Sequence, residues 1–250
     1  MRIARYRFAN WTLSVHTRVD IDFTGADRYL ARTAPRDGIG REHLWLWACA
    51  RVIRERPLFN AAFDGFRDLR PREDIHLRVS VRTPTGGLGF VVVEHADRLD
   101  PRAMAERLRA LAASAAPPEH VELAPRTRTG RLGRLMDDLE QTLVDYAPHL
   151  EHRIGGGAGG EAGTFTVLDA GAWGAEDFHA VLLRPALAML VVMAPRTDVV
   201  PGAQGPEVAV RVPMAVPFCH KMMDTDAAGY FLFHMQQLLD DPDRYLGKSR

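Results

Sequence analysis

Alternating apolar and polar positions mark the predicted strands. Residues 12–24 and 73–82 alternate as strands with one buried face do. Residues 83–87 carry a proline and two glycines, which indicate a turn into another strand over 88–93, so a hairpin is predicted here. Further apolar stretches predict three more strands, over 164–168, 186–194 and 207–218.

Apolar residues at helical spacing predict four helices. Pro57 follows the first and suits its end, and the second begins with a proline in its first turn, a favoured position. Residues 117–130 are rich in proline and arginine, and the glycines of 155–160 form a loop with no phosphate-binding lysine after them. The helices are predicted over 40–56, 101–116, 131–146 and 224–240. The mixture of strands and helices predicts one α/β domain over residues 1–250.

Composition and charge narrow the class of protein. The 250 residues have 32 basic and 32 acidic side chains, a net charge of zero that disfavours a general nucleic-acid binder. The two cysteines fit neither a disulfide framework nor a zinc motif. The longest apolar run, 186–194, is too short to span a bilayer, and no signal peptide is recognisable. We therefore expect a cytoplasmic protein with no nucleic-acid or membrane partner, although a local basic pocket stays possible.

A histidine four residues before an aspartate occurs twice, as His16 with Asp20 and as His220 with Asp224. The spacing alone carries little weight, because both residue types are common in the chain. The first pair lies inside a predicted strand, whereas the second lies where a strand meets a helix. There Asp224 can accept backbone N–H groups at the helix N-terminus, and His220 is held rigid and exposed. His220 is the better candidate for a catalytic base.

Several segments resemble, in collinear order, the superfamily of chloramphenicol acetyltransferase and the dihydrolipoamide acyltransferases. Residues 219–246 (CHKMMDTDAAGYFLFHMQQLLDDPDRYL) resemble its C-terminal motif, in which a strand leads to a His, an Asp at a helix start and a closing Asp-Pro. Residues 56–65 (RPLFNAAFDG) resemble its Pro-x-x-Asn-Ala segment, and residues 75–97 its hairpin with Thr-Pro and Gly-Leu. Residues 164–193, beginning TFTVLDAG, resemble its Thr-Phe-Thr segment and the strand behind it.

This resemblance implies a chloramphenicol acetyltransferase-like two-layer sandwich, with a mixed sheet flanked by helices. It implies that His220 is the general base that deprotonates an acceptor, since an imidazole exchanges protons near neutral pH. Asp224 would fix the loop that holds His220. The resemblance further implies a homotrimer with active sites at subunit interfaces, and a coenzyme A thioester as co-substrate, or a thioester on a carrier protein or lipoyl arm. No metal is expected.

The sequence also departs from the family pattern. The family's oxyanion donor is a Ser or Thr, and the flanking residues place Leu168 at that position, with Thr166 two residues earlier. We expect both in the substrate-binding region. Thr225 replaces the family glycine, Cys219 replaces an Asp or His, and Lys221 replaces an Arg. We also expect an insertion around 117–163, and no lipoyl or peripheral subunit-binding domain.

Three functions therefore stay open. The first is a stand-alone acyltransferase that moves an acyl group from a thioester to a hydroxyl, amine or thiol of a small molecule. The second is a catalytically altered member that acts as a structural trimer or an accessory binding protein. The third is elimination or condensation on a carrier-bound acyl substrate. We expect no special chemistry from several other residues: a packed thiol at Cys219, surface or pocket-edge histidines at 95, 179 and 234, and core aromatics at 45, 47 and 59.

Overall fold

The computed structural model describes residues 14–63, 69–70, 72–115, 163–182, 186–202 and 205–246. The helix predicted over 131–146, the glycine-rich loop at 155–160 and nearly all of the expected insertion lie outside these residues. No helix within the described ranges is long and apolar enough to cross a membrane.

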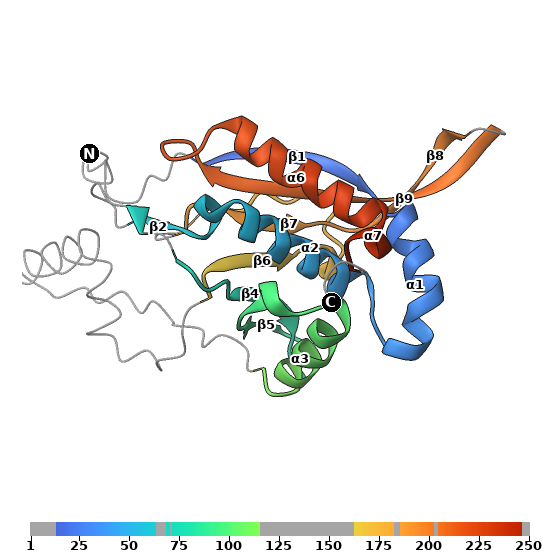
Figure 1. Cartoon of the computed structure of the whole chain (residues 1–250), viewed down its shortest axis with the longest axis horizontal. Helices are drawn as coiled ribbons and strands as arrows, with labels where there is room; N and C mark the ends of the chain where they lie inside the picture. Colours follow the sequence, from blue (N-terminus) through green and yellow to red (C-terminus); the bar gives the residue numbers. More distant parts are fainter. Residues whose placement is uncertain are drawn as a thin grey trace, which may run out of the picture.

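The described elements alternate between strands and helices (Figure 1). The helices are α1 (Thr24–Asp37), α2 (Arg41–Glu55), η1 (Pro57–Asn60), η2 (Ala96–Arg98), α3 (Pro101–Ala113), η3 (Gly171–Trp173), α6 (Thr225–Asp240) and α7 (Pro242–Leu246). The strands are β1 (Ser14–Asp22), β2 (Ala62–Phe63), β3 (Leu69–Arg70), β4 (Leu77–Arg82), β5 (Leu88–Val93), β6 (Phe165–Asp169), β7 (Met189–Val192), β8 (Arg196–Gly202) and β9 (Gly205–Cys219).

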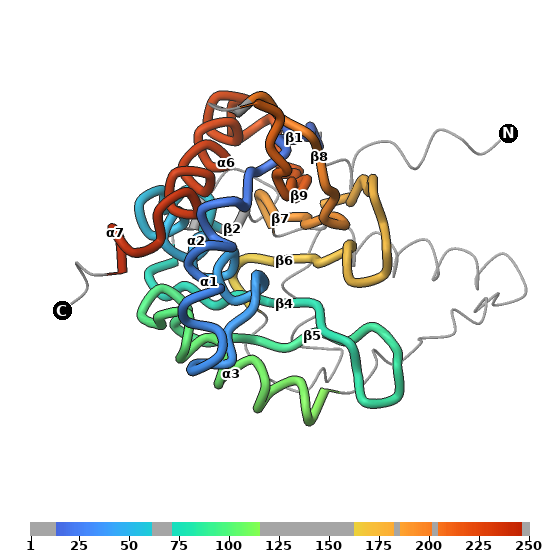
Figure 2. Tube along the Cα trace, turned by 90° about the vertical axis from the view of Figure 1, so that its right-hand side faces the viewer, coloured from blue at the N-terminus to red at the C-terminus, as the bar shows by residue number. Residues whose placement is uncertain are grey.

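One mixed sheet organises the molecule. Its strands follow the order β1-β9-β7-β6-β4-β5, with β8 also paired to β9, as the tube of Figure 2 shows. Strands β4, β6 and β7 are parallel neighbours, and the other pairs are antiparallel. The β8–β9 hairpin extends away from the rest of the molecule (Figure 1). The predicted mixed sheet with flanking helices is confirmed.

Helices cover one face of this sheet, which we call the helix face (Figure 2). Phe231 of α6 is fully buried there, with its ring 4.7 Å from that of Phe59 and 5.9 Å from that of Phe165 in β6. Trp45 and Trp47 of α2 belong to the same core, so the predicted core aromatics are confirmed. Alternation sends Phe165 and Val167 of β6 to this face.

The opposite face, which we call the loop face, is crossed by residues 170–182 rather than by helices (Figure 2). This segment covers a small apolar cluster that includes Met189, Val191 and Ala215. It is also tied to β1, because Arg18 lies 2.8 Å from Asp177. The sheet is therefore closed by a large core on one side and by a single loop on the other.

Among the elements that the hydrophobic pattern did not predict are α1, β8 and α7. Helix α1 is polar and has Pro35 inside it, so its periodicity is weak. Gly25 lets α1 approach α6, since a Cβ there would lie 1.9 Å from the backbone oxygen of Asp240. Strand β8 contains Pro201 and exposes most of Val199, and α7 has only five residues. None of the three buries a continuous apolar face.

Candidate functional site

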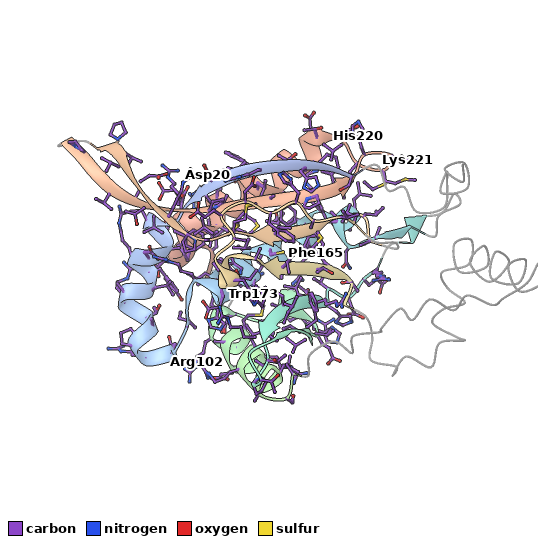
Figure 3. The ribbon with its side chains drawn as sticks, turned by 180° about the vertical axis from the view of Figure 1, so that it is seen from behind. Asp20, Arg102, Phe165, Trp173, His220 and Lys221 are labelled. Carbon is purple, nitrogen blue, oxygen red and sulfur yellow. The ribbon has the colours of Figure 1, made fainter. Side chains whose placement is uncertain are left out.

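His220 lies in the turn that directly follows β9. The turn is closed by the carbonyl oxygen of Cys219, which accepts the N–H groups of Met222 at 2.9 Å and Met223 at 3.0 Å. The imidazole is exposed and stands edge-on to the Phe218 ring at 6.2 Å. Figure 3 shows His220 and Lys221 together at this end of the sheet, with Asp20 further along β1. Hydrogen bonds therefore hold the backbone around His220, while its ring is open to solvent.

Asp224 is the N-cap residue of α6, as its position in the sequence suggested. Its carbonyl oxygen accepts the N–H of Ala227 at 3.1 Å, but its carboxylate makes no capping hydrogen bond. The expectation that this carboxylate accepts helix N–H groups is therefore wrong for the chain as described. The Asp224 side chain is exposed, and no contact joins it to His220 within the described residues. Both side chains remain available to other groups.

Thr166 and Leu168 project from β6 toward the loop face. Leu168 packs against the small apolar cluster there, and Thr166 is half-buried. The register places Leu168 beside Val191 of β7, and Val191 beside Ala215 of β9. His220 comes five residues after Ala215 and two strands away, which corresponds to roughly 20 Å. For Thr166 the same reasoning gives about 14 Å. A single chain therefore does not bring these two residues to His220.

Cys219 packs in the core with 1% of its surface exposed, which confirms a packed thiol. Lys221, two residues later, is exposed in the turn that follows β9.

The other histidines of the described residues differ in their exposure. His179 is exposed, whereas His234 is 9% exposed and lies 3.1 Å from Glu55, so it does not lie on the open surface. His95 is half-exposed and lies against His76.

A cavity of about 400 Å³ opens at the other end of the strands, where β4 and β6 finish. Its walls include His43, Arg82 and Asp169. Burial raises the pKa of the Asp169 carboxyl, although its hydrogen bond from the N–H of Ala172 acts in the opposite sense. The cavity lies away from His220. Strand β9 runs antiparallel to β7, so β9 ends at the opposite end of the strands from the cavity.

The sheet order and the one-sided helical layer define a class of fold. Solved structures with this fold include a probable dihydrolipoamide acetyltransferase from Listeria monocytogenes (TM-score 0.66, 19% identity, 91% of this chain and 84% of that chain). Another is dihydrolipoamide acetyltransferase from Azotobacter vinelandii (TM-score 0.67, 20% identity, 93% and 84%). A chloramphenicol acetyltransferase also matches (TM-score 0.54, 13% identity, 94% and 91%). The chain has the chloramphenicol acetyltransferase-like fold.

The sequence comparisons narrow the class further. The family model of the 2-oxoacid dehydrogenases acyltransferase (catalytic domain) matches residues 157–247. The dihydrolipoyllysine-residue succinyltransferase component of the 2-oxoglutarate dehydrogenase complex from Bartonella vinsonii subsp. berkhoffii is 26% identical over 201 residues. That match covers 79% of this chain, which spans about two fifths of the relative's length. The C-terminal part of the chain is thus similar to the catalytic domain of this acyltransferase family, and the whole chain shares its fold.

Proposed function

We propose that this protein transfers an acyl group from a thioester to a hydroxyl, amine or thiol of a small molecule. The observation that carries the proposal is the position of His220, an exposed imidazole on a rigid turn at the end of β9. It stands in the fold shared with chloramphenicol acetyltransferase and the dihydrolipoamide acetyltransferases. A general base needs this combination of fixed position and access to substrate.

In the proposed reaction His220 removes the proton from the acceptor as the acceptor attacks the thioester carbonyl. The tetrahedral oxyanion then collapses, the carbon–sulfur bond breaks, and the thiolate leaves and takes up the proton. Coenzyme A is the donor that we propose, and a carrier protein or lipoyl thioester is the alternative. Leu168 has no hydrogen-bond donor for the oxyanion, and loss of one such donor typically costs about 10²–10³ in rate.

We propose that the working form is a homotrimer with the active site at the subunit interface. Thr166 and Leu168 lie roughly 14 and 20 Å from His220 of the same chain, so they can reach its substrate only from another subunit. The segment that crosses the loop face also exposes three large apolar side chains, Trp173, Phe178 and Val181. Exposed apolar side chains gathered on one segment favour a protein contact.

Leu168 also supports a second candidate, in which the trimer is structural or binds an acyl ligand without transferring it. A third candidate keeps His220 as a base for elimination or condensation on a carrier-bound substrate, where an oxyanion donor is dispensable. Release of thiol separates the three. Transfer releases coenzyme A only with an acceptor, and the accessory protein releases none. Elimination changes the acyl chain without releasing the thiol, whereas condensation on a carrier-bound substrate releases the thiol of the carrier and no free coenzyme A.

The test is acyl transfer by the full chain. Purified protein is incubated with acetyl-CoA or a longer acyl-CoA and a panel of hydroxyl, amine and thiol acceptors, including dihydrolipoamide, while free thiol is followed. We expect His220→Ala to lower the rate by about 10²–10⁴. Arg102→Ala is the control, because it removes an exposed charged side chain from α3, and we expect its rate to be that of the unmodified chain.

Two results would contradict the proposal. One is thiol release that survives His220→Ala at an unchanged rate. The other is a monomeric mass, instead of three times the 27.9 kDa of one chain, in light scattering of the active protein.

A further inference from the structure

Three side chains lie close together at the end of the sheet where β4 begins. Asp74 and His76 precede β4, and His95 follows β5. Each offers a ligand atom, and these atoms all lie within 4.8 Å of one another. Among the described residues this is the one group of three His, Cys, Asp or Glu side chains that converge in this way.

The fold holds these residues in place through the β4–β5 hairpin. Leu77 is paired with Val93, which brings the residues just outside the hairpin together, and Ala96 donates its N–H to the carbonyl of Ile75 at 2.8 Å. The buried Asn60 donates from Nδ2 to the backbone carbonyl of Asp74 at 2.9 Å. The backbone on both sides of the cluster is therefore fixed before any ligand arrives.

The contact between His95 and Asp74 has the geometry of two ligands that share one ion. Nδ1 of His95 lies 3.1 Å from Oδ1 of Asp74, yet this nitrogen is shielded from solvent and makes no hydrogen bond among the described residues. The two atoms are close without being aligned as donor and acceptor. Zinc bonds of about 2.0–2.2 Å in a tetrahedron place neighbouring ligand atoms roughly 3.4 Å apart, which is near the observed separation.

His76 presents a nitrogen to the same point. It is 7% exposed, and its Nδ1 accepts the backbone N–H of His95 at 3.1 Å. An ion bound at Nδ1 would replace this hydrogen bond. Arg98, 3.3 Å from Oδ1 of Asp74, would also have to turn away, but it is exposed and surface ion pairs are weak. Metal–imidazole bonds are much stronger than either contact.

The backbone of His95 adopts an unfavourable conformation. Its φ is +49°, and it is the one described residue other than glycine with a positive φ. Such a conformation persists in a folded protein only where the surroundings enforce it, and it is often found at functional sites. Here the residue in this conformation carries the imidazole that lies 3.1 Å from Asp74.

We propose that Asp74, His76 and His95 bind a divalent transition-metal ion of the zinc class. Two imidazoles and one carboxylate suit zinc, and they suit calcium or magnesium poorly because those ions prefer oxygen. Three protein ligands leave a coordination position for water. The site lies at β4, three strands away from β9 and His220. A test of metal binding is therefore independent of a test of the proposed acyl transfer.

The test is zinc binding to the full chain after treatment with a chelator. Calorimetry with ZnCl₂ should show one site whose affinity falls by at least about 100-fold in His95→Asn and in Asp74→Asn, since even changes next to metal ligands cost 10–100-fold. Asparagine tolerates a positive φ, so His95→Asn removes the imidazole with little effect on the backbone. Substitution with Co²⁺ should give visible absorption bands that the variants lack.

The matched control is His179→Asn. His179 also has an aspartate and a second histidine beside it, Asp177 at 3.7 Å and the ring of His16 at 5.1 Å, but these do not converge as the proposed ligands do. We expect its zinc affinity to stay within about twofold of the unmodified chain. Equal zinc affinity in the unmodified chain and His95→Asn, or the absence of binding to the chelator-treated chain, would overturn the proposal.

Discussion

The two faces of the sheet are built differently. On the helix face, α2 and α6 close a continuous core whose largest members, such as Trp47 and Phe231, are almost fully buried. On the loop face, one segment covers a cluster of seven buried residues, and the strands carry half-exposed polar side chains such as His16 and Arg18. The helix face therefore holds the larger apolar core, and the loop face keeps polar side chains accessible.

The clearest test of this contrast is the same substitution on each face. Phe231→Ala should lower the free energy of unfolding by about 3–5 kcal/mol, because it removes a fully buried ring that packs on two others. Phe178→Ala, on the segment that crosses the loop face, should change it by no more than about 0.5 kcal/mol, because 39% of that side chain is already exposed. Urea unfolding of both variants measures the difference.

Protein concentration sharpens this comparison. If Phe178 contributes to a contact between subunits, its variant should lose the concentration dependence of the unfolding midpoint, which Phe231→Ala should keep. A large destabilisation by Phe178→Ala in dilute protein would show that the loop face supports the single chain as much as the helix face does.

A second prediction uses Leu168 on the loop face. Leu168→Ser supplies a hydroxyl at the position that the family resemblance assigns to the oxyanion donor, so we expect acyl transfer to rise by about 10²–10³. Leu168→Ala is the matched control, because it also removes the branched end of the side chain but adds no donor. Thiol release with acetyl-CoA is the measurement. Equal rates for the two variants would mean that position 168 does not face the oxyanion.

The third prediction returns to the helical layer. Gly25→Ala should destabilise the protein by about 1–3 kcal/mol, because the new methyl group would meet the backbone of Asp240 and push α1 away from α6. Gly229→Ala in α6 meets nothing within 4 Å and should stabilise the protein by about 0.5–1 kcal/mol. Thermal unfolding of the pair measures both effects. Similar losses in the two variants would place α1 elsewhere than beside the end of α6.

The sequence predicted the sheet strands other than β8, and the helices α2, α3 and α6, because each of these buries apolar side chains in a regular pattern. It could not predict how far Thr166 lies from His220, since that depends on β7 entering the sheet between β6 and β9. The unbonded carboxylate of Asp224 was also out of reach, because capping depends on a side-chain rotamer that no spacing encodes.

The Asp74, His76 and His95 cluster was within reach of the sequence. The predicted hairpin over 73–93 turns at 83–87, and a tight turn there already pairs the residues before one strand with those after the other. Spacing of metal ligands along the chain gave no sign of the group, because nineteen residues separate the two histidines. Ligands brought together by strand register are found by pairing the strands, and not by motif spacing.

The smallest expected effect is a pH dependence that comes from the loop face. Burial lowers the pKa of His16, and His179, whose ring is 5.1 Å away, lowers it further. The folded chain therefore binds fewer protons than the unfolded chain once the pH falls below the ordinary value of 6.5. This contribution to stability is present above pH 6.5 and is lost as the pH falls through the lowered pKa.

His16→Gln should therefore flatten the decline in Tm between pH 6.5 and 5, by about 2 °C or less for a chain of this length. His179→Gln should have a smaller effect in the same direction, because it removes only the repulsion between the two imidazoles and leaves His16 buried. Asp177 loses His179 as a neighbour but keeps Arg18 at 2.8 Å. His43, whose pKa burial also lowers, contributes equally in every variant and cancels in the comparison. A steeper decline in His16→Gln than in the unmodified chain would show that His16 is protonated in the folded protein, and that the loop face already holds a charge there.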